Sequence, residues 1–228
     1  MFLQGALMLQ GALASRTPVL GWSTWCTGNK CGRDWCSSSE ILSVATAMRD
    51  EQLQAAGFDH ILLDDCWGVR NATTGRIEAD AERFPEGMAA FAAQIHNLSF
   101  KLGLYTDMGV DACHAPFTGS WPHYEQDARD FVAWGVDMVK FDYCGPPAGH
   151  DPAELTQSMG AALRRAATGA AAPPPWFHFH CDKLTFEDTR CGEYGDSFRV
   201  MDDHIDAWYS TVKVSKRLHV CLTIVTSS

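Results

Sequence analysis

Two aspartates, Asp142 and Asp203, each follow a short apolar run that also carries a basic residue, Lys140 in the first case and Arg199 in the second. Paired carboxyl groups can cleave a sugar acetal, because that reaction passes through an oxocarbenium-like transition state. One ionised carboxylate faces the anomeric carbon, and one protonated carboxyl group donates its proton to the leaving oxygen. The two segments therefore predict glycoside hydrolysis.

Apolar strand-like runs alternate with stretches of helical periodicity, a pattern typical of repeated βα units and a parallel sheet. Strands are predicted at Val19–Trp22, His60–Asp64, Lys101–Asp107, Met138–Phe141, Trp176–His180 and Arg199–Met201. Helices are predicted at Ser38–Ala56, Gly87–Ile95, Tyr124–Trp134, Pro152–Ala167 and Ile205–Leu218, with Ser38 or Ser39 capping the first. The breaker-rich stretch Thr168–Pro175 is predicted to connect elements of the same domain.

Chemically competent side chains gather just beyond the ends of the predicted strands. They are Trp25, Asp64, Asp65, Tyr105, Asp107, Lys140, Asp142, Asp182, Arg199 and Asp203. This face carries the active site in a parallel barrel, and the equivalent crevice binds ligands in an open doubly wound sheet. Groups that converge from every strand favour the barrel, and the sequence lacks the Gly-x-Gly-x-x-Gly motif of nucleotide binding. The predicted fold class is α/β, a TIM (β/α)8-type barrel of which about six units are present.

Five motifs follow one another along the chain. They are Thr17-Pro-Val-Leu-Gly-Trp-Ser-Thr-Trp25, Leu63-Asp-Asp-Cys-Trp67, Arg83-Phe-Pro-Glu-Gly87, Lys101-Leu-Gly-Leu-Tyr-Thr-Asp107 and Gly135-Val-Asp-Met-Val-Lys-Phe-Asp142. Together with the segment Arg199–Trp208, these motifs resemble glycoside hydrolase family 27, the α-galactosidases and α-N-acetylgalactosaminidases. The resemblance implies a barrel glycosidase that uses no cofactor and no metal.

By this resemblance, Asp142 is the nucleophile and Asp203 is the acid/base of a retaining enzyme, a class whose carboxyl groups lie about 5 to 5.5 Å apart. Asp202 and Asp206 are close enough to compete for the second role, and the spacing from the preceding arginine selects Asp203. Strand alternation places Lys140 on the same face as Asp142, where its charge can keep that carboxylate ionised. The predicted substrate contacts are Trp25, Asp64, Asp65, Tyr105, Lys140, Asp182 and Arg199.

The loop after the fifth predicted strand sets the choice of sugar in this family. The resemblance implies that α-galactosidases carry an acidic residue there, which contacts the 2-hydroxyl, whereas α-N-acetylgalactosaminidases carry smaller residues that admit the acetamide. Asp182 argues for galactose, and Thr185 fits either sugar. The predicted function is therefore hydrolysis of terminal α-linked galactose from oligosaccharides or glycoconjugates. The alternatives are an α-N-acetylgalactosaminidase and an inactive galactose-binding fragment or pseudoenzyme.

The chain has 228 residues, a formal net charge of −10 and nine cysteines. The scattered basic residues argue against a nucleic acid partner, and no apolar run reaches the roughly 18 residues of a membrane helix. Two glycosylation sequons begin at Asn71 and Asn97, and residues 1–14 end in the small-residue pattern of a weak signal peptide. The predicted location is therefore secreted, lysosomal or vacuolar, and the sequence does not indicate an oligomeric state.

Two disulfides are predicted in the second half of the chain. By the resemblance, Cys113 and Cys144 form a bridge beside the nucleophile strand. Cys181 and Cys191 are predicted to form another, which leaves Cys221 as the odd cysteine.

The first loop carries the remaining expected bridges. For Cys66, the resemblance implies a partner in that loop, either Cys26 or Cys31. The loop also holds Cys36, and the two of its three cysteines that Cys66 leaves over would pair with each other. A zinc site is the competing interpretation, and it is disfavoured because paired Cys-x2-Cys spacing is absent.

The sequence stops resembling the family after Lys213. A full barrel takes roughly 250 residues, so the seventh and eighth units and the family's C-terminal β domain are expected to be missing. The predicted domains are a signal peptide at 1–14, a partial catalytic barrel at 15–213 and an unrelated tail at 214–228. The chain is expected to be a fragment, and whether it is itself active is left open.

Overall fold

The computed structural model describes residues 18–25, 35–168, 170, 173–181 and 191–199. One parallel sheet contains β1 (Gly21–Ser23), β2 (His60–Leu63), β5 (Lys101–Asp107), β6 (Met138–Asp142), β7 (Trp176–His180) and β8 (Ser197–Arg199). An antiparallel hairpin contains β3 (Gly68–Arg70) and β4 (Ile77–Ala79). The helices are α1 (Ser38–Asp50), α2 (Met88–Asn97), α3 (Tyr124–Trp134), α4 (Pro152–Ala167) and the short α5 (Cys191–Tyr194). None of these helices is long and apolar enough to cross a bilayer.

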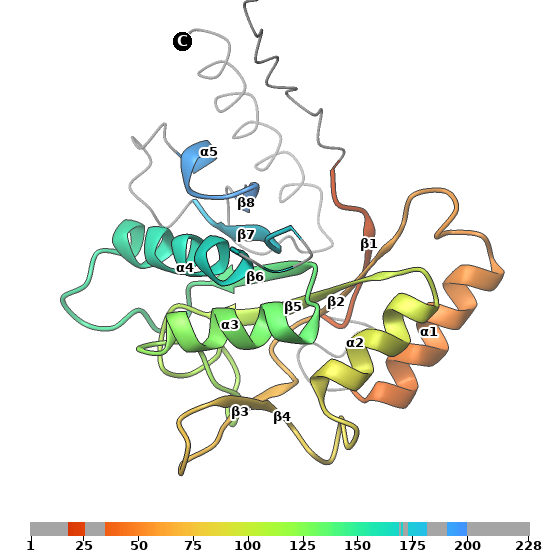
Figure 1. The fold of residues 1–228 in the computed structure, drawn as a ribbon, viewed down its shortest axis with the longest axis horizontal. Helices are drawn as coiled ribbons and strands as arrows, with labels where there is room; N and C mark the ends of the chain where they lie inside the picture. Colours follow the sequence, from red (N-terminus) through yellow and green to blue (C-terminus); the bar gives the residue numbers. More distant parts are fainter. Residues whose placement is uncertain (1–17, 26–34, 169, 171–172, 182–190, 200–228) are drawn as a thin grey trace, which may run out of the picture.

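The described parallel strands follow one another in chain order, β1-β2-β5-β6-β7-β8. A doubly wound sheet instead reverses its strand order at a switch point, because its helices cover both faces. Here the sheet curls into a half-barrel, and α1, α2, α3 and α4 succeed one another along its outer side (Figure 1). The prediction of an incomplete (β/α) barrel is therefore confirmed.

Strand β6 shows how the site residues come to face the inside of the curl. Phe141 of β6 is completely buried, and its ring lies 5.6 Å from that of Tyr124 in α3. Burial of such a side chain stabilises the fold by about 1.5–3 kcal/mol, which fixes the face that β6 turns outward. Lys140 and Asp142 consequently occupy the inner face, and the sheet register sets Tyr105 beside Lys140.

Helix α1 begins with a capping box. The Ser37 hydroxyl accepts a hydrogen bond from the Glu40 backbone N–H, and the Glu40 carboxylate accepts one from the Ser37 backbone N–H at 3.1 Å. This reciprocal pair satisfies N–H groups that a helix start leaves without an acceptor. The prediction of Ser38 or Ser39 as the cap is wrong, because the reciprocal pair needs the residue three positions before the glutamate.

The same helix is shorter than predicted. It ends at Asp50 and not at Ala56, because Gln52 takes a left-handed φ of 60°, which a right-handed helix cannot continue. The predicted bounds of β5, β7, α3 and α4 are confirmed, whereas β1 is displaced from its predicted bounds. Strand β8 begins at Ser197, before its predicted start at Arg199, and its predicted end at Met201 lies outside the described residues.

The hairpin β3–β4 and helix α5 are elements that the sequence did not predict. Asn71 builds the hairpin turn, because its side-chain oxygen accepts hydrogen bonds from the backbone of Thr73 and Thr74. Arg70 of β3 donates to both carboxylate oxygens of the fully buried Asp127 in α3, each at 2.7 Å. The hairpin is therefore anchored to the helical layer by a bidentate ion pair.

Three disulfides join described residues: Cys36–Cys66, Cys113–Cys144 and Cys181–Cys191. The second and third confirm the predicted pairs. The partner predicted for Cys66, either Cys26 or Cys31, is wrong, because Cys66 pairs with Cys36. Cys36 directly precedes the cap of α1, and the packing of that helix beside the end of β2 brings the two Cα atoms to 6.2 Å.

Several predicted features lie outside the described residues. They are the signal peptide at 1–14, Cys26, Cys31, Asp182, Asp203, the helix Ile205–Leu218, Cys221 and the tail at 214–228.

Candidate active site

A cavity of about 380 Å³ lies at the carboxyl ends of the parallel strands. Its lining residues are Trp25, Asp64, Asp65, Cys113, His114, Lys140, Asp142, Tyr143, Cys144, His180 and Arg199. The volume is at the small end of the range for ligand pockets, as suits a single sugar ring. The cavity lies at the end of the sheet where the sequence predicted the site residues to gather.

Lys140 is at the centre of the charged groups. Its Nζ donates to Asp64 Oδ2 at 2.7 Å and lies 3.4 Å from Asp142 Oδ2. The rings of Tyr105 and Trp25 flank the ammonium group, with centroids at 5.1 and 5.8 Å. Burial lowers the pKa of Lys140, but the two carboxylates outweigh burial and raise that pKa above its usual value. The site therefore holds a permanent cation between two acids.

Asp142 is held as an anion. Its Oδ1 accepts the backbone N–H of Tyr143 at 2.8 Å and lies 2.7 Å from Nε2 of His180. Burial raises the pKa of Asp142, but the hydrogen bond with His180 and the charge of Lys140 outweigh burial and hold that pKa well below its usual range. A buried carboxylate that stays ionised is what a nucleophilic displacement at an anomeric carbon requires.

Asp65 has the opposite tendency. Its Oδ2 is hydrogen-bonded to Nδ1 of His114 at 2.5 Å, and its Oδ1 has no partner within the part of the chain that the structure describes. Burial raises the pKa of Asp65 to about 6, and the neighbouring Asp64 carboxylate adds to the rise, although the His114 hydrogen bond opposes it. Asp65 therefore has one acceptor oxygen without a described partner, on a side chain that lines the cavity.

Replacing Asp65 with asparagine is expected to stabilise the protein at pH 8 but hardly at pH 4. The raised pKa means that the folded state pays for ionising Asp65, and this cost is absent below the ordinary value near 3.8 and fully present above about 6. We expect a gain of about 1–2 kcal/mol at pH 8, reduced by solvent screening at the cavity. Urea unfolding at pH 8 and pH 4 measures this change in stability, with the exposed Asp111→Asn as the control. A change of equal size at both pH values would contradict the raised pKa of Asp65.

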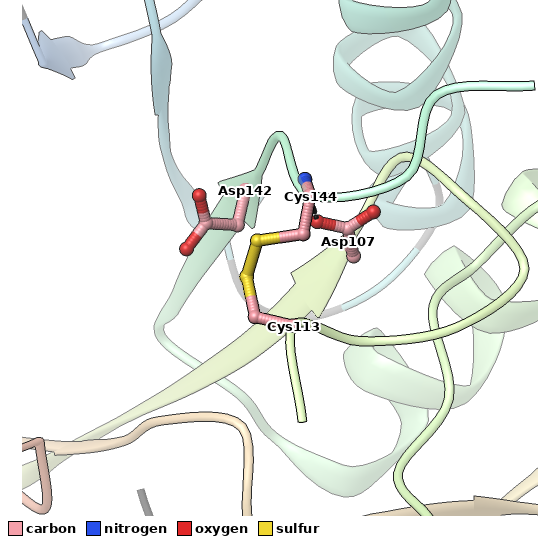
Figure 2. A group of neighbouring side chains, drawn as sticks. All are labelled: Asp107, Cys113, Asp142 and Cys144. Carbon is pink, nitrogen blue, oxygen red and sulfur yellow. Dashed lines mark hydrogen bonds between the residues drawn. A yellow bond between two sulfur atoms is a disulfide. The ribbon is translucent and has the colours of Figure 1, made fainter. Parts of the chain in front are cut away.

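A four-residue cluster at the strand ends has the spacing of a metal site. The ligand atoms of Asp107, Cys113, Asp142 and Cys144 lie within 4.8 Å of one another. Figure 2 shows, however, that the two sulfurs are joined in a disulfide lying between the two carboxyl groups. Metal ions bind thiolates, which a disulfide does not supply. The cluster is therefore a covalent clamp that ties the loop after β5 to the loop after β6.

Asp107 reinforces that clamp. Its carboxylate accepts backbone N–H groups from Gly109 at 2.8 Å and from Cys144 at 2.7 Å. A Cβ atom on Gly109 would lie 1.9 Å from the Gly145 carbonyl oxygen, so the close approach of the two loops requires glycine. The backbone that follows Asp142 is thereby fixed, and with it the position of the carboxylate itself.

The predicted site residues are brought together wherever the structure describes them. Trp25, Asp64, Asp65, Lys140, Asp142 and Arg199 line the cavity. Tyr105 lies next to Lys140 and shares a contact with Cys113, whose sulfur is 3.0 Å from the Tyr105 hydroxyl oxygen. Asp182 and Asp203 lie outside the described residues, so the second predicted carboxyl group has no described position.

The family model for alpha galactosidase A matches residues 17–222. The chain belongs to the alpha galactosidase A family. Among its relatives, human alpha-galactosidase A is 33% identical over 215 residues, which make up 90% of this chain and 49% of the human protein. Alpha-galactosidase 2 of Arabidopsis thaliana is 32% identical over 217 residues, with 93% and 51% of the two chains covered. The chain spans about half the length of the curated relatives it matches.

Solved structures of alpha-galactosidases have the same arrangement of elements. Alpha-galactosidase I from Mortierella vinacea is 27% identical with a TM-score of 0.62, over 72% of this chain and 40% of that chain. The Saccharomyces cerevisiae enzyme, in a structure with raffinose, is 30% identical with a TM-score of 0.61, over 72% and 35% of the respective chains. The incomplete barrel therefore corresponds to part of a larger fold in these relatives.

Two residues of this alpha galactosidase A family member were missed by the sequence interpretation. His114 bonds to Asp65, and its ring lies 5.5 Å from that of Trp25. His180 bonds to Asp142. Their positions in the sequence could have indicated them, because His180 is the last residue of a predicted strand and His114 directly follows a cysteine of the predicted Cys113–Cys144 disulfide.

Proposed function

We propose that this protein hydrolyses terminal α-linked galactose with retention of configuration. The observation that carries the proposal is the environment of Asp142, a buried carboxylate held ionised by Lys140 and His180 at the wall of a sugar-sized cavity. The yeast relative in the structure with raffinose supports the choice of sugar, because raffinose ends in an α-linked galactose.

Galactose recognition is assigned to the acids and aromatic rings around Lys140. Asp64 and Asp65 offer carboxylate oxygens, which accept hydrogen bonds from sugar hydroxyls. Trp25 offers an aromatic face to the apolar C–H patch of the ring. Arg199 and Lys140 add cationic donors on the side of the nucleophile.

The reaction we propose has two displacements. An oxygen of Asp142 forms a bond to the anomeric carbon while the bond from that carbon to the leaving oxygen breaks, and Asp203 gives the leaving oxygen its proton. Water then attacks the anomeric carbon, Asp203 takes up a proton from it, and Asp142 departs as a carboxylate. Each step inverts the anomeric carbon, so the product keeps the α configuration. Lys140 keeps Asp142 ionised for the first step, and it stabilises the carboxylate that the second step regenerates.

We further propose a secretory location for the protein. Three disulfides among the described residues require an oxidising compartment in which to form and persist. A lysosomal, vacuolar or extracellular destination fits the predicted glycosylation sequons at Asn71 and Asn97 equally well.

Hydrolysis of an aryl α-galactoside by the full chain, secreted from a eukaryotic host, tests this function. We expect aryl release, with α-galactose as the first sugar product in proton NMR, and much slower release from the aryl α-N-acetylgalactosaminide. Faster turnover of the acetamido sugar would favour the α-N-acetylgalactosaminidase alternative. Calorimetric galactose binding without turnover, in a protein with a cooperative melting transition, would favour the binding remnant and overturn hydrolysis. A first product of β configuration would overturn retention.

A further inference from the structure

The last residue of β7, His180, lies directly against the proposed nucleophile. Its Nε2 is 2.7 Å from Asp142 Oδ1, and its side chain is only 5% exposed. Arg199 Nη1 lies 3.4 Å from the same nitrogen. An imidazole lone pair facing a carboxylate oxygen at 2.7 Å would be repelled, whereas an N–H group at that distance forms a charge-assisted hydrogen bond. The shorter contact decides the assignment: Nε2 of His180 carries a proton and donates it to Asp142, so the longer approach of Arg199 Nη1 to that nitrogen is not a hydrogen bond.

The two oxygens of Asp142 are held differently. Oδ1 accepts from His180 and also from the backbone N–H of Tyr143 at 2.8 Å, which are two short contacts. The described contact of Oδ2 is the longer one, with Lys140 Nζ at 3.4 Å. One donor follows β6 and the other ends β7. Together they fix the plane of the carboxylate, because each donates to a lone pair of Oδ1. Oδ2, on a side chain that lines the cavity, is thereby left with capacity for a new bond.

We propose that His180 is a positioning residue, which holds Asp142 through Oδ1 and so presents Oδ2 to the anomeric carbon. This inference rests on the proposed function, since it gives Asp142 the role of nucleophile. In the first displacement, Asp142 Oδ2 bonds to the anomeric carbon, the bond to the leaving oxygen breaks, and the acid/base group supplies the proton to that oxygen. His180 keeps its own proton throughout, and it acts on the sugar only through Asp142.

The neighbouring His178 distinguishes a positioning histidine from a merely buried one. It lies two residues earlier on the same face of β7, and its Nδ1 is 2.9 Å from the Ser197 hydroxyl. Burial, helped by the nearby cations, lowers the pKa of His178 to about 4, so its ring is neutral at ordinary pH. Because its described hydrogen bond goes to a serine, His178 provides a matched control for His180.

Kinetics of the full chain test the role of His180 in turnover. We expect His180→Ala to lower kcat about 10–100-fold, as loss of a supporting contact typically does, with KM changed less than about twofold. His180→Asn, which keeps a side-chain N–H donor, should recover part of the loss, and melting temperatures show whether each variant folds. An unchanged kcat in a folded His180→Ala variant would overturn the proposal, as would a loss found in KM alone.

Nuclear magnetic resonance of the same proteins tests the contact without turnover. The imidazole proton shared with Asp142 should resonate far downfield, its ¹⁵N partner should be Nε2, and Asp142→Asn should shift it upfield. The signal should disappear in His180→Asn and persist in His178→Asn. Absence of a signal with these dependences would overturn the positioning role. A wild-type chain that shows the signal yet hydrolyses nothing would instead count against the proposed function.

Discussion

Substitution of Asp142 by asparagine is expected to abolish hydrolysis of an aryl α-galactoside, with kcat lowered on the order of 10⁴-fold or more. The amide keeps the shape of the side chain and its hydrogen bond from Tyr143. It carries no negative charge, however, so it neither stabilises the oxocarbenium-like transition state nor forms the glycosyl ester. The contacts that we propose between the sugar and Asp64 and Asp65 do not involve the substituted group, so galactose binding should persist. Initial rates and calorimetry measure the two quantities separately.

Asp111→Asn supplies the control for this variant, because Asp111 is an exposed aspartate on the loop that follows β5. Its kcat should equal that of the wild type. A complementary variant, Asp142→Gly, leaves room for a small anion in place of the carboxylate. Azide should then restore release of the aryl group and yield a β-galactosyl azide, since it attacks from the face that Asp142 occupies. An α-galactosyl azide, or full activity of Asp142→Asn, would show that another group is the nucleophile.

The half-barrel could be predicted from the sequence because each of its main strands has a recognisable residue pattern within its own short segment. The run Lys101–Asp107 has an apolar centre from Leu102 to Tyr105, and apolar and charged residues alternate along Val139–Asp142. Parallel strands place all their carboxyl ends at one edge, so motifs far apart in the chain must converge there. Asp64, Lys140 and Asp142 could therefore be grouped before any contact was known, and they do lie around one cavity.

His114 and His180 could not be predicted as site residues in this way, because their hydrogen-bond partners depend on sheet register and loop packing. His178 and His180 share one face of β7, and only the pairing of Lys140 with His178 places the second histidine level with Asp142. His114 reaches Asp65 across 49 positions of sequence. The choice of Cys36 for Cys66 likewise depends on where α1 packs, which no cysteine spacing encodes.

Replacement of Lys140 by methionine is expected to destabilise the folded protein strongly at neutral pH. Methionine fills a similar volume, but Asp64 and Asp142 then lose the cation they share, and their side chains are only 4% and 11% exposed. Removal of one partner from a buried charge cluster typically costs about 3–5 kcal/mol, because uncompensated charge stays buried. Catalysis should also fall, since the pKa of Asp142 rises when the lysine charge that helps to depress it is gone.

The sign of the pH dependence separates this explanation from lost packing. In the wild type the depressed pKa of Asp142 contributes stability that is present above its ordinary value and is lost as pH falls through the folded-state value. Without Lys140 that contribution shrinks or reverses, so the loss of stability in the variant should be largest at pH 7.5 and smaller at pH 4.5, where carboxyl groups take up protons.

Urea unfolding at both pH values measures this deficit in stability. Lys101→Met removes an exposed lysine at the start of β5, where it pairs with Asp59, and should change stability by less than about 0.5 kcal/mol. A deficit of equal size at both pH values would mean that Lys140 acts through its packing and not through its charge.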